Sequence, residues 1–348
     1  AIVGAGIAGL SVAYALARAG ARPVVLERHG IAEAASGRNG GFILAGVVEN
    51  FVAACRRFGP AAARRIWRVT VTNRVLLAAI ARRHAIACDL AWNGSLQLAG
   101  DDDEWQEIRE SAAALGAQGV RVTLHPETRS AVHEEDGEMH PVRFVRGLAD
   151  AAETLGARIH EGTNATAVHA DRVVTPRGTV RAGAVVSCTN AYSARLLAGA
   201  RIAPVRGQML ATAPIAERIF PRPVYAHRGY RYWRQDRQGR VLVGGWRDTA
   251  MEVEVGEDAT PTDRVQRHLD AFLAEHGVRA PVTHRWAGIM GFSHDGLPYI
   301  GKRASGVYML AGFTGHGNAF AIAGGEIVAS LIRTGHHPDA DLFDPDRP

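Results

Sequence analysis

The fold is decided by AIVGAGIAGLSVAYALARAGARPVVLER, residues 1–28. The apolar "AIVG" predicts a short strand, and "LSVAYALARAG" predicts a helix that Gly20 ends. Between them, Gly4, Gly6 and Gly9 have the GxGxxG spacing. The first glycine permits a tight turn, the second lets a pyrophosphate approach the backbone, and the third lets the helix pack closely on the strand. Residues 1–28 therefore predict a dinucleotide site at a helix N-terminus, where free N–H groups face the phosphates.

An acidic residue ends the second predicted strand, "RPVVLER". Glu27 lies 18 residues after Gly9, where a carboxylate can accept hydrogen bonds from a ribose 2′-OH. Its charge would repel the 2′-phosphate of NADP, so the unit favours NAD or FAD. The neighbouring Arg28 is a further candidate for contact with the cofactor.

The segment after this strand, "GIAEAASGRNGGFILAG", is rich in glycine and polar residues. It offers backbone amides, a hydroxyl and a cation to an extended ligand with a second phosphate and a polar ring edge, which favours FAD over NAD. A mobile linker is the competing interpretation, but "FILAG" returns to apolar sequence at once. The candidate cofactor contacts here are Ser36, Arg38, Asn39, Gly40 and Gly41.

A second strand, glycine-rich turn and helix end the chain, as "VYMLAG", "GFTGHGNA" and "AIAGGEIVASLI". This helix N-terminus would also face a ligand, and it could stabilise negative charge on a reduced flavin ring. The candidate contacts are Gly315, His316, Gly317 and Asn318. His316 lies between two glycines, and its two interpretations are a flavin contact and a core histidine that caps the turn.

These motifs occur in one order with "TLGARIHEGTNATAVHADRVVTPRGTVRAGAVVSCTNAYSARLL", "PVRGQML" (204–210) and "WAG…DGLPYIG". In that order the chain resembles, nearly end to end, the D-amino-acid-oxidase superfamily of FAD oxidoreductases. "ASGRNGG" is most similar to the γ-glutamylputrescine-oxidase group. The resemblance implies an α/β fold with a Rossmann-like FAD-binding domain (1–88, 140–212 and 285–348). An antiparallel-sheet α+β substrate domain (89–139 and 213–284) would be interleaved with it. It also implies that Val168 contacts the adenine through its backbone and that Thr189 and Asn190 lie near the pyrophosphate.

The resemblance implies oxidation of a C–N bond, in which a neutral amine gives hydride to flavin N5 and the imine is hydrolysed. The acceptor would be O2, giving hydrogen peroxide, or another oxidant. In relatives that read "WAGLRP", an arginine holds the substrate carboxylate, but Met290 stands at that position. The change favours an amine without this carboxylate, unless Arg228 or Arg231 compensates. Oxidation of a D-amino acid or an N-methyl amino acid is the alternative.

Flavin attachment and substrate contacts are further expectations. Some relatives tether the flavin through a Cys or a His, but this chain has Ile289 and Met290 in one segment and Arg38 and Asn39 in the other, which predicts non-covalent FAD. In "YRYWRQDRQGRVLVGGW" (230–246), a predicted hairpin, alternation places Tyr230 and Tyr232 on one face and Trp233 on the other. That face suits an amine, and core packing is the competing interpretation. The residues expected nearest the reacting atoms are His316, Tyr232 and Met290, and the substrate candidates are Tyr230, Tyr232, Arg228 and His227.

Composition sets broader limits. The chain has 348 residues, 47% of them hydrophobic, and a formal charge of +5 with one lysine, Lys302. Its arginines are scattered, which disfavours a nucleic-acid partner. Three cysteines predict neither a disulfide framework nor a metal site, and a reducing, cytoplasmic setting is expected. No apolar run is long enough to span a bilayer. The acidic "HEEDGEMHP" (133–141) is interpreted as a solvated loop. A small-molecule amine and an electron acceptor are the expected partners, and the oligomeric state stays open.

Two other classes of protein compete with this prediction. An NAD-dependent dehydrogenase is disfavoured because it would not need the two extra glycine-rich segments. A flavin-bearing binding module without turnover is the other alternative.

Overall fold

The computed structural model describes residues 1–348. Its helices are α1 Ile7–Arg18, α2 Ala35–Arg38, α3 Phe51–Phe58, α4 Pro60–Arg83, α5 Asp102–Gly116, α6 Pro141–Thr154, α7 Asp263–Glu275 and α8 Gly317–Thr334. Short 3₁₀ helices are η1 Pro126–Thr128, η2 Asn190–Arg195, η3 Arg247–Thr249 and η4 Ala340–Phe343. None of the helices has the length and apolarity that crossing a membrane would require.

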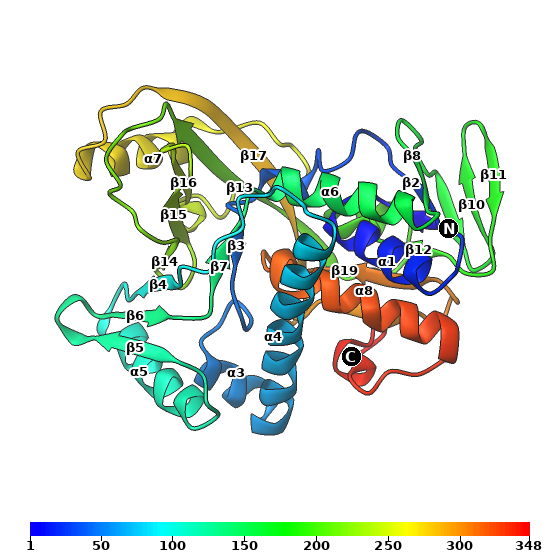
Figure 1. Cartoon of the computed structure of the whole chain (residues 1–348), viewed down its shortest axis with the longest axis horizontal. Coiled ribbons are helices and arrows are strands. Elements are labelled where there is room, and N and C mark those ends of the chain that lie inside the picture. The colour runs from blue at the N-terminus through cyan, green and yellow to red at the C-terminus, as the bar shows by residue number, and fades with distance from the viewer.

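A six-stranded sheet holds the N-terminal glycine motif (Figure 1). Its strands, in spatial order, are β18 Tyr299–Lys302, β19 Tyr308–Ala311, β12 Val186–Ser187, β1 Ile2–Val3, β2 Val24–Leu26 and β8 Arg158–His160. All neighbours are parallel except β18 and β19. Ile2 and Val25 belong to the core shared with α1, α6 and α8, while Val3 and Leu26 belong to a second core on the opposite face. This alternation follows from the two-residue period of a strand.

Two glycines determine how closely the helices pack on this sheet and on each other. A Cβ on Gly9 would lie 1.9 Å from the carbonyl oxygen of Gly4, so α1 can approach β1 only with glycine at this position. In the same way, a Cβ on Gly325 of α8 would lie 2.7 Å from Ser11 of α1. The two long apolar helices are therefore packed backbone to backbone.

An eight-stranded sheet forms the second lobe, seen on the left of Figure 1 with α5 and α7. Its order is β17 Val282–Ser293, β13 Ile202–Thr212, β16 Val241–Gly245, β15 Arg231–Gln235, β14 Val224–Ala226, β4 Ser95–Leu98, β6 Ser130–His133 and β5 Val122–His125. All its pairs are antiparallel except β14 with β4. The predicted hairpin is present as β15 and β16, and "GSLQLAG" contains β4.

Two small sheets complete the fold. β9 Ala167–His169, β10 Arg172–Thr175 and β11 Gly178–Arg181 form one, and β3 Phe42–Ile43 pairs with β7 Gly137–Glu138 in the other. The predicted α/β architecture with an antiparallel second sheet is confirmed. The predicted segments 140–212 and 285–348 include β13 and most of β17, and both strands run in the eight-stranded sheet.

The acidic segment 133–141 is not the solvated loop that its composition indicates. Asp136 is 4% exposed, and its carboxylate accepts hydrogen bonds from Arg74 Nη1 at 2.7 Å and from Ser95 Oγ at 2.7 Å. Glu138 is equally buried and accepts a hydrogen bond from Arg234 Nη1 at 2.9 Å. Arginines distant in sequence neutralise both carboxylates, and this allows the loop to be buried between the two lobes.

We expect Arg74→Met to lower the free energy of unfolding by about 3–5 kcal/mol, because it leaves the Asp136 carboxylate buried without its cation. Chemical denaturation of the two proteins measures the difference. Arg121→Met is the matched control, since Arg121 is exposed and reaches Glu135 only at 3.7 Å; its effect should stay within about 0.5 kcal/mol. Equal effects of the two substitutions would contradict this view of the loop.

Candidate active site

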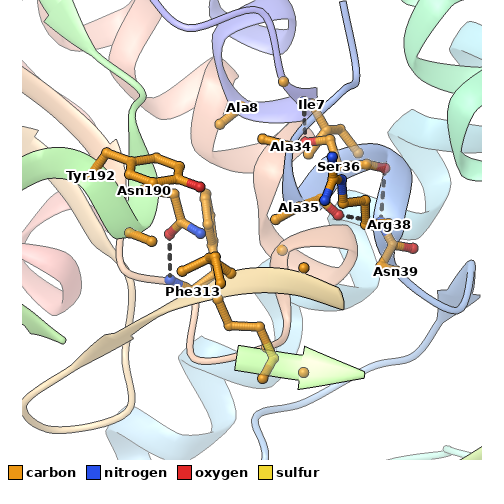
Figure 2. A pocket seen from close by; sticks show the side chains of 18 of the residues that line it. Ile7, Ala8, Ala34, Ala35, Ser36, Arg38, Asn39, Asn190, Tyr192 and Phe313 are labelled. Carbon is orange, nitrogen blue, oxygen red and sulfur yellow. Dashed lines mark hydrogen bonds between the residues drawn. The ribbon is translucent and has the colours of Figure 1, made fainter. Parts of the chain in front are cut away.

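A cavity of about 610 Å³ lies between the two sheets and joins the glycine-rich turn after β1 to the hairpin β15–β16. Its walls come from segments far apart in sequence, namely the turn 4–8, the segment 26–48, residues 163–166, 188–196, the hairpin and the turn before α8. Figure 2 shows part of this wall, with Ile7 and Ser36 on one side and Asn190 and Phe313 on the other. The predicted sites at the two ends of the chain thus share one cavity.

The first end of the cavity is built from the N-terminal motif. Gly4 has φ +105° and Gly6 faces Ser36, whose Oγ accepts the Ile7 N–H of α1 at 2.9 Å. A Cβ on Gly6 would lie 2.6 Å from that oxygen and would fill the cradle. Glu27 lines the wall, and its Oε2 accepts the N–H of Ala5 at 2.7 Å. A carboxylate beside a helix N-terminus matches what the ribose and pyrophosphate of a dinucleotide require.

The segment 36–41, which contains the end of α2, forms hydrogen bonds with residues near the C-terminus of the chain. Asn318 of α8 donates from Nδ2 to Asn39 Oδ1 at 3.1 Å, and the same oxygen accepts the Gly41 N–H at 2.8 Å. Arg38 donates from Nη1 to the carbonyl of Ala287 on β17 at 2.9 Å. Arg38, Asn39, Gly40 and Gly41 all line the cavity. The hydrogen bonds therefore hold this loop as a rigid wall and not as a mobile linker.

Of the cofactor contacts predicted in the middle of the chain, some line the cavity and one does not. Thr189 and Asn190 line the cavity, and Arg28 lines it with its guanidinium 4.9 Å from the centre of the Tyr192 ring. Val168 is buried in the core behind the sheet and does not line the cavity. The wall there is formed by residues 163–166, which precede β9. Gly9 also lies outside the lining and acts through the packing of α1.

The N-terminus of α8 forms the opposite end. Gly315, His316, Gly317 and Asn318 all line the cavity, and no side chain caps the helix. Burial lowers the pKa of His316 to about 4, so its imidazole is neutral near pH 7. Its Nδ1 is buried without a hydrogen-bond partner. A neutral ring with an unsatisfied nitrogen is poised to bind a ligand group, which supports a ligand contact over a purely structural role.

Aromatic side chains from the second lobe close this end. Tyr230 and Tyr232 line the cavity, while Trp233 packs in the opposite core with its ring 4.7 Å from that of Phe272. Met290 of β17 lies beside Tyr232, since both side chains approach Gly207. A Cβ built on Gly207 would be 2.9 Å from Met290 Cε and 3.8 Å from Tyr232 Oη. Burial raises the pKa of Tyr232 to about 12, which keeps its phenol protonated.

The basic candidates of the turn 227–231 are already paired. His227 does not line the cavity, and its Nε2 is 3.1 Å from Arg231 Nη1. Arg228 lines the cavity but donates from Nη1 to Glu107 at 2.7 Å. Arg231 is 4.0 Å from Asp248 and does not line the cavity. These contacts leave neither arginine free to replace the family's carboxylate-binding residue.

Tyr225 and Arg247 are among the lining residues that were not predicted from the sequence. Tyr225 of β14 has its ring 6.1 Å from the His316 ring, edge to face, and alternation within "VYA" could have identified it. Arg247 of η3 lies with its guanidinium over the rings of Tyr230 and Phe292. No periodic signal marks Arg247, because it follows the end of β16 in a turn.

Comparison with known proteins identifies the family. The model of the DAO family, described as FAD dependent oxidoreductase, matches residues 1–331. The chain belongs to this family. It is 27% identical to gamma-glutamylputrescine oxidoreductase of Escherichia coli K12 over 371 aligned positions, covering 99% of this chain and 84% of that protein. It is 28% identical to glycine oxidase of Pseudomonas aeruginosa PAO1 over 375 positions, covering 98% and 96%.

Solved structures agree on the fold. Glycine oxidase from Geobacillus kaustophilus superposes with a TM-score of 0.85 at 22% identity, covering 100% of this chain and 98% of that one. L-Proline dehydrogenase from P. horikoshii gives the same TM-score at 23% identity, covering 99% and 96%.

Membership of the family confirms the prediction of an oxidoreductase that depends on FAD. The cavity fits this cofactor, because it offers the N-termini of α1 and α8, a cradle at Gly6 and a buried unpaired nitrogen on His316.

We expect Gly9→Ala to destabilise the protein and reduce its FAD content, because the new methyl group would collide with the Gly4 carbonyl and push α1 off β1. Overpacking of this kind costs about 1–3 kcal/mol. Thermal unfolding and the ratio of flavin to protein absorbance measure both effects. Gly116→Ala in α5 is the control, since a Cβ there meets nothing within 4 Å and alanine favours the helix. A normal flavin ratio in Gly9→Ala would contradict this role for α1.

We expect His316 to make stability depend on pH between about 6.5 and 4. Within this range the unfolded chain binds the proton first, so the folded state loses stability as the pH falls. Above pH 6.5 the imidazole is neutral in both states and contributes no pH dependence. Melting temperatures of the wild type and His316→Gln, compared at pH 7.5 and 4.5, should therefore change by different amounts. The exposed His336→Gln variant is the control, and parallel curves for all three proteins would show that His316 is not buried as neutral imidazole.

Proposed function

We propose that the protein oxidises a primary or secondary amine to an imine, which water then hydrolyses. One observation carries the proposal: a single cavity joins the dinucleotide end at Gly6 and Glu27 to an aromatic end at Tyr225, Tyr230 and Tyr232. FAD, when bound, supplies flavin N5 as the acceptor of the hydride that leaves the substrate α-carbon. The aromatic end is where a small amine would meet that acceptor.

The residues of the chain would hold FAD at both ends. The first turn of α1 would bind the pyrophosphate, and Glu27 would bind the ribose. The loop from Ser36 to Gly41 would line the isoalloxazine, and the bare N-terminus of α8 would stabilise negative charge on that ring. His316, whose Nδ1 has no protein partner, would donate to or accept from the flavin or the substrate.

The reacting end would favour a neutral amine. Glu27 is the only carboxylate that lines the cavity, and it lies at the dinucleotide end. The imidazole of His316 is neutral, and the phenol of Tyr232 is protonated near pH 7. An ammonium ion would find no counter-ion there, so the substrate would lose its proton on entry. The aromatic walls would exclude water and hold the α-carbon in line.

FAD would be held without a covalent bond. Cys188 lines the cavity, but burial raises the pKa of its thiol far above the usual range, so no thiolate is available to react. The segments that carry a tether in relatives hold Arg38, Asn39, Ile289 and Met290 here, and none of these can form it. Acid precipitation of the purified protein should therefore release all of its flavin into the supernatant.

The acceptor of the electrons would be O2, with release of hydrogen peroxide, or a different oxidant. Lys302 does not line the cavity, and its Nζ lies 5.7 Å from the centre of the Tyr308 ring. The only lysine of the chain is therefore not available to stabilise superoxide. Oxygen uptake by the amine-reduced protein separates an oxidase from a dehydrogenase.

Anaerobic reduction of the flavin tests the proposed function. Amines, polyamines, D-amino acids and N-methyl amino acids are mixed in turn with the holoenzyme, and bleaching of the visible absorption of oxidised flavin is followed. We expect at least one class to bleach the flavin at a rate that saturates with concentration. Failure of every class would favour a flavin-bearing module without turnover, the alternative that the sequence left open.

Amino-acid oxidation is the second candidate function. It is favoured by the similarity to glycine oxidase, 28% identical over 98% of this chain. Reduction by D-amino acids or N-methyl amino acids alone would select it and would exclude simple amines. In that case a cation at another position must bind the carboxylate, because Met290 stands where relatives have the arginine.

A further inference from the structure

One cation at the aromatic end of the cavity has no partner. Arg247 is the first residue of η3, which Trp246 separates from the end of β16, and it lines the cavity. Its guanidinium lies 5.1 Å from the centre of the Tyr230 ring and 5.1 Å from that of Phe292. No carboxylate forms an ion pair with it and no acceptor hydrogen-bonds to it, although it is only partly exposed. The guanidinium therefore lies over two aromatic rings, and its five N–H donors have no acceptor within the protein.

The other arginines of the cavity are engaged. Arg228 is paired with Glu107, Arg195 with Glu257, and Arg38 donates to two backbone carbonyls. Arg28 lies against Tyr192 at the dinucleotide end. Arg247 is therefore the one cation at the aromatic end that is free to bind a ligand.

The backbone around Arg247 fixes its position. Gly245 has φ +111°, and a Cβ on it would lie 2.1 Å from the Tyr230 carbonyl. Trp246 adopts φ +57° and donates its N–H to the same carbonyl at 2.6 Å. Two consecutive residues in the left-handed region turn the chain back over Tyr230. This turn brings Arg247 over the cavity, and strain of this kind gathers at ligand sites.

Arg247 lies next to the position of Met290. Phe292, which Arg247 contacts, is two residues from Met290 on β17, so both side chains are on one face of the strand. The field of Arg247 also reaches Tyr232, where it favours the ionised phenol against the larger effect of burial. The guanidinium therefore lies within the group of side chains that surrounds the expected position of the substrate.

We infer that Arg247 binds an acidic group of the substrate, so that the preferred amine carries a carboxylate that pairs with this guanidinium. The inference rests on the proposed function and deepens it. It moves the preference of the site from simple amines and polyamines toward amino acids and other amino carboxylates. A diamine would bring its second ammonium close to an unneutralised arginine, with no acid at that end of the cavity to offset the repulsion.

Calorimetric titration of the holoenzyme with propionate and with propionamide tests this inference without turnover. The two probes have the same shape and differ in charge. We expect the wild type to bind propionate about 10- to 100-fold more tightly, the range expected of a charge-assisted pair in a partly buried site. Arg247→Met should remove this preference, and Arg247→Lys should retain a reduced preference because it keeps the charge without the planar fork.

Arg264→Gln is the matched control, because Arg264 is exposed and pairs with Glu252 outside the cavity. It removes the same charge and should leave the preference for propionate unchanged. Equal binding of the two probes by the wild type would overturn the inference, as would a preference that survives in Arg247→Met. If Arg247→Met does not fold, an undiminished preference in Arg247→Lys would likewise overturn it.

Anaerobic reduction separates this inference from the proposed function. N-Methylglycine and N-methylglycinamide are compared as reductants of the wild type and of Arg247→Met. Reduction at a lower half-saturating concentration by the acid, lost in the variant, supports both proposals. Equal reduction by acid and amide keeps amine oxidation but overturns the inference about Arg247. An Arg247-dependent preference for propionate, without reduction by any amine, supports the acidic subsite and overturns amine oxidation.

Discussion

The contact between Gly9 and the carbonyl of Gly4 is the constraint on which the site depends. It allows α1 to lie directly on β1, so that the N-terminus of α1 opens into the cavity. α8 then lies on α1 through another missing side chain, at Gly325 against Ser11. The N-terminus of α8, at the aromatic end of the cavity, is therefore placed by the same backbone packing that places the dinucleotide end. A displacement of α1 would move both helix N-termini at once.

Local patterns were enough to predict most of the elements that carry the site. α1, the hairpin β15–β16, and the unit from β19 to α8 each have a period or a turn signal that does not depend on distant residues. The loop 36–41 was also predicted as a cavity wall, because glycine and polar residues return there directly to apolar sequence. The Asn39–Asn318 hydrogen bond that fixes this wall joins residues 279 apart in sequence, and no local pattern encodes it.

Charged residues were harder to predict, because their role depends on tertiary partners. Asp136 and Glu138 look solvated within "HEEDGEMHP", yet Arg74 and Arg234 make their burial possible. Arg228 looked available for a carboxylate, yet Glu107 of α5 already occupies it. In each case the sequence allows the charged side chain either to form an internal ion pair or to stay available for solvent or a ligand. Which of the two occurs depends on whether the fold places an opposite charge within 4 Å.

The electrostatics of the cavity separate its two tasks. At the dinucleotide end, the N-terminus of α1 would attract the phosphates of the cofactor, and Glu27 would accept hydrogen bonds from its ribose. At the aromatic end, burial lowers the pKa of His316 and raises that of Tyr232, so both side chains stay neutral near pH 7. Hydride removal from a neutral amine would therefore meet no strong base or acid. Arg247 is the exception, and a single free cation is of little use to a reaction whose electrophile is the cofactor. Its position is instead suited to orientation, because a carboxylate fixed by a planar fork leaves the α-carbon few directions in which to point. Arg247 lies on a turn and not on β17, but it faces the same side of β17 as Met290. It can therefore orient a carboxylate as well as an arginine at position 290 would.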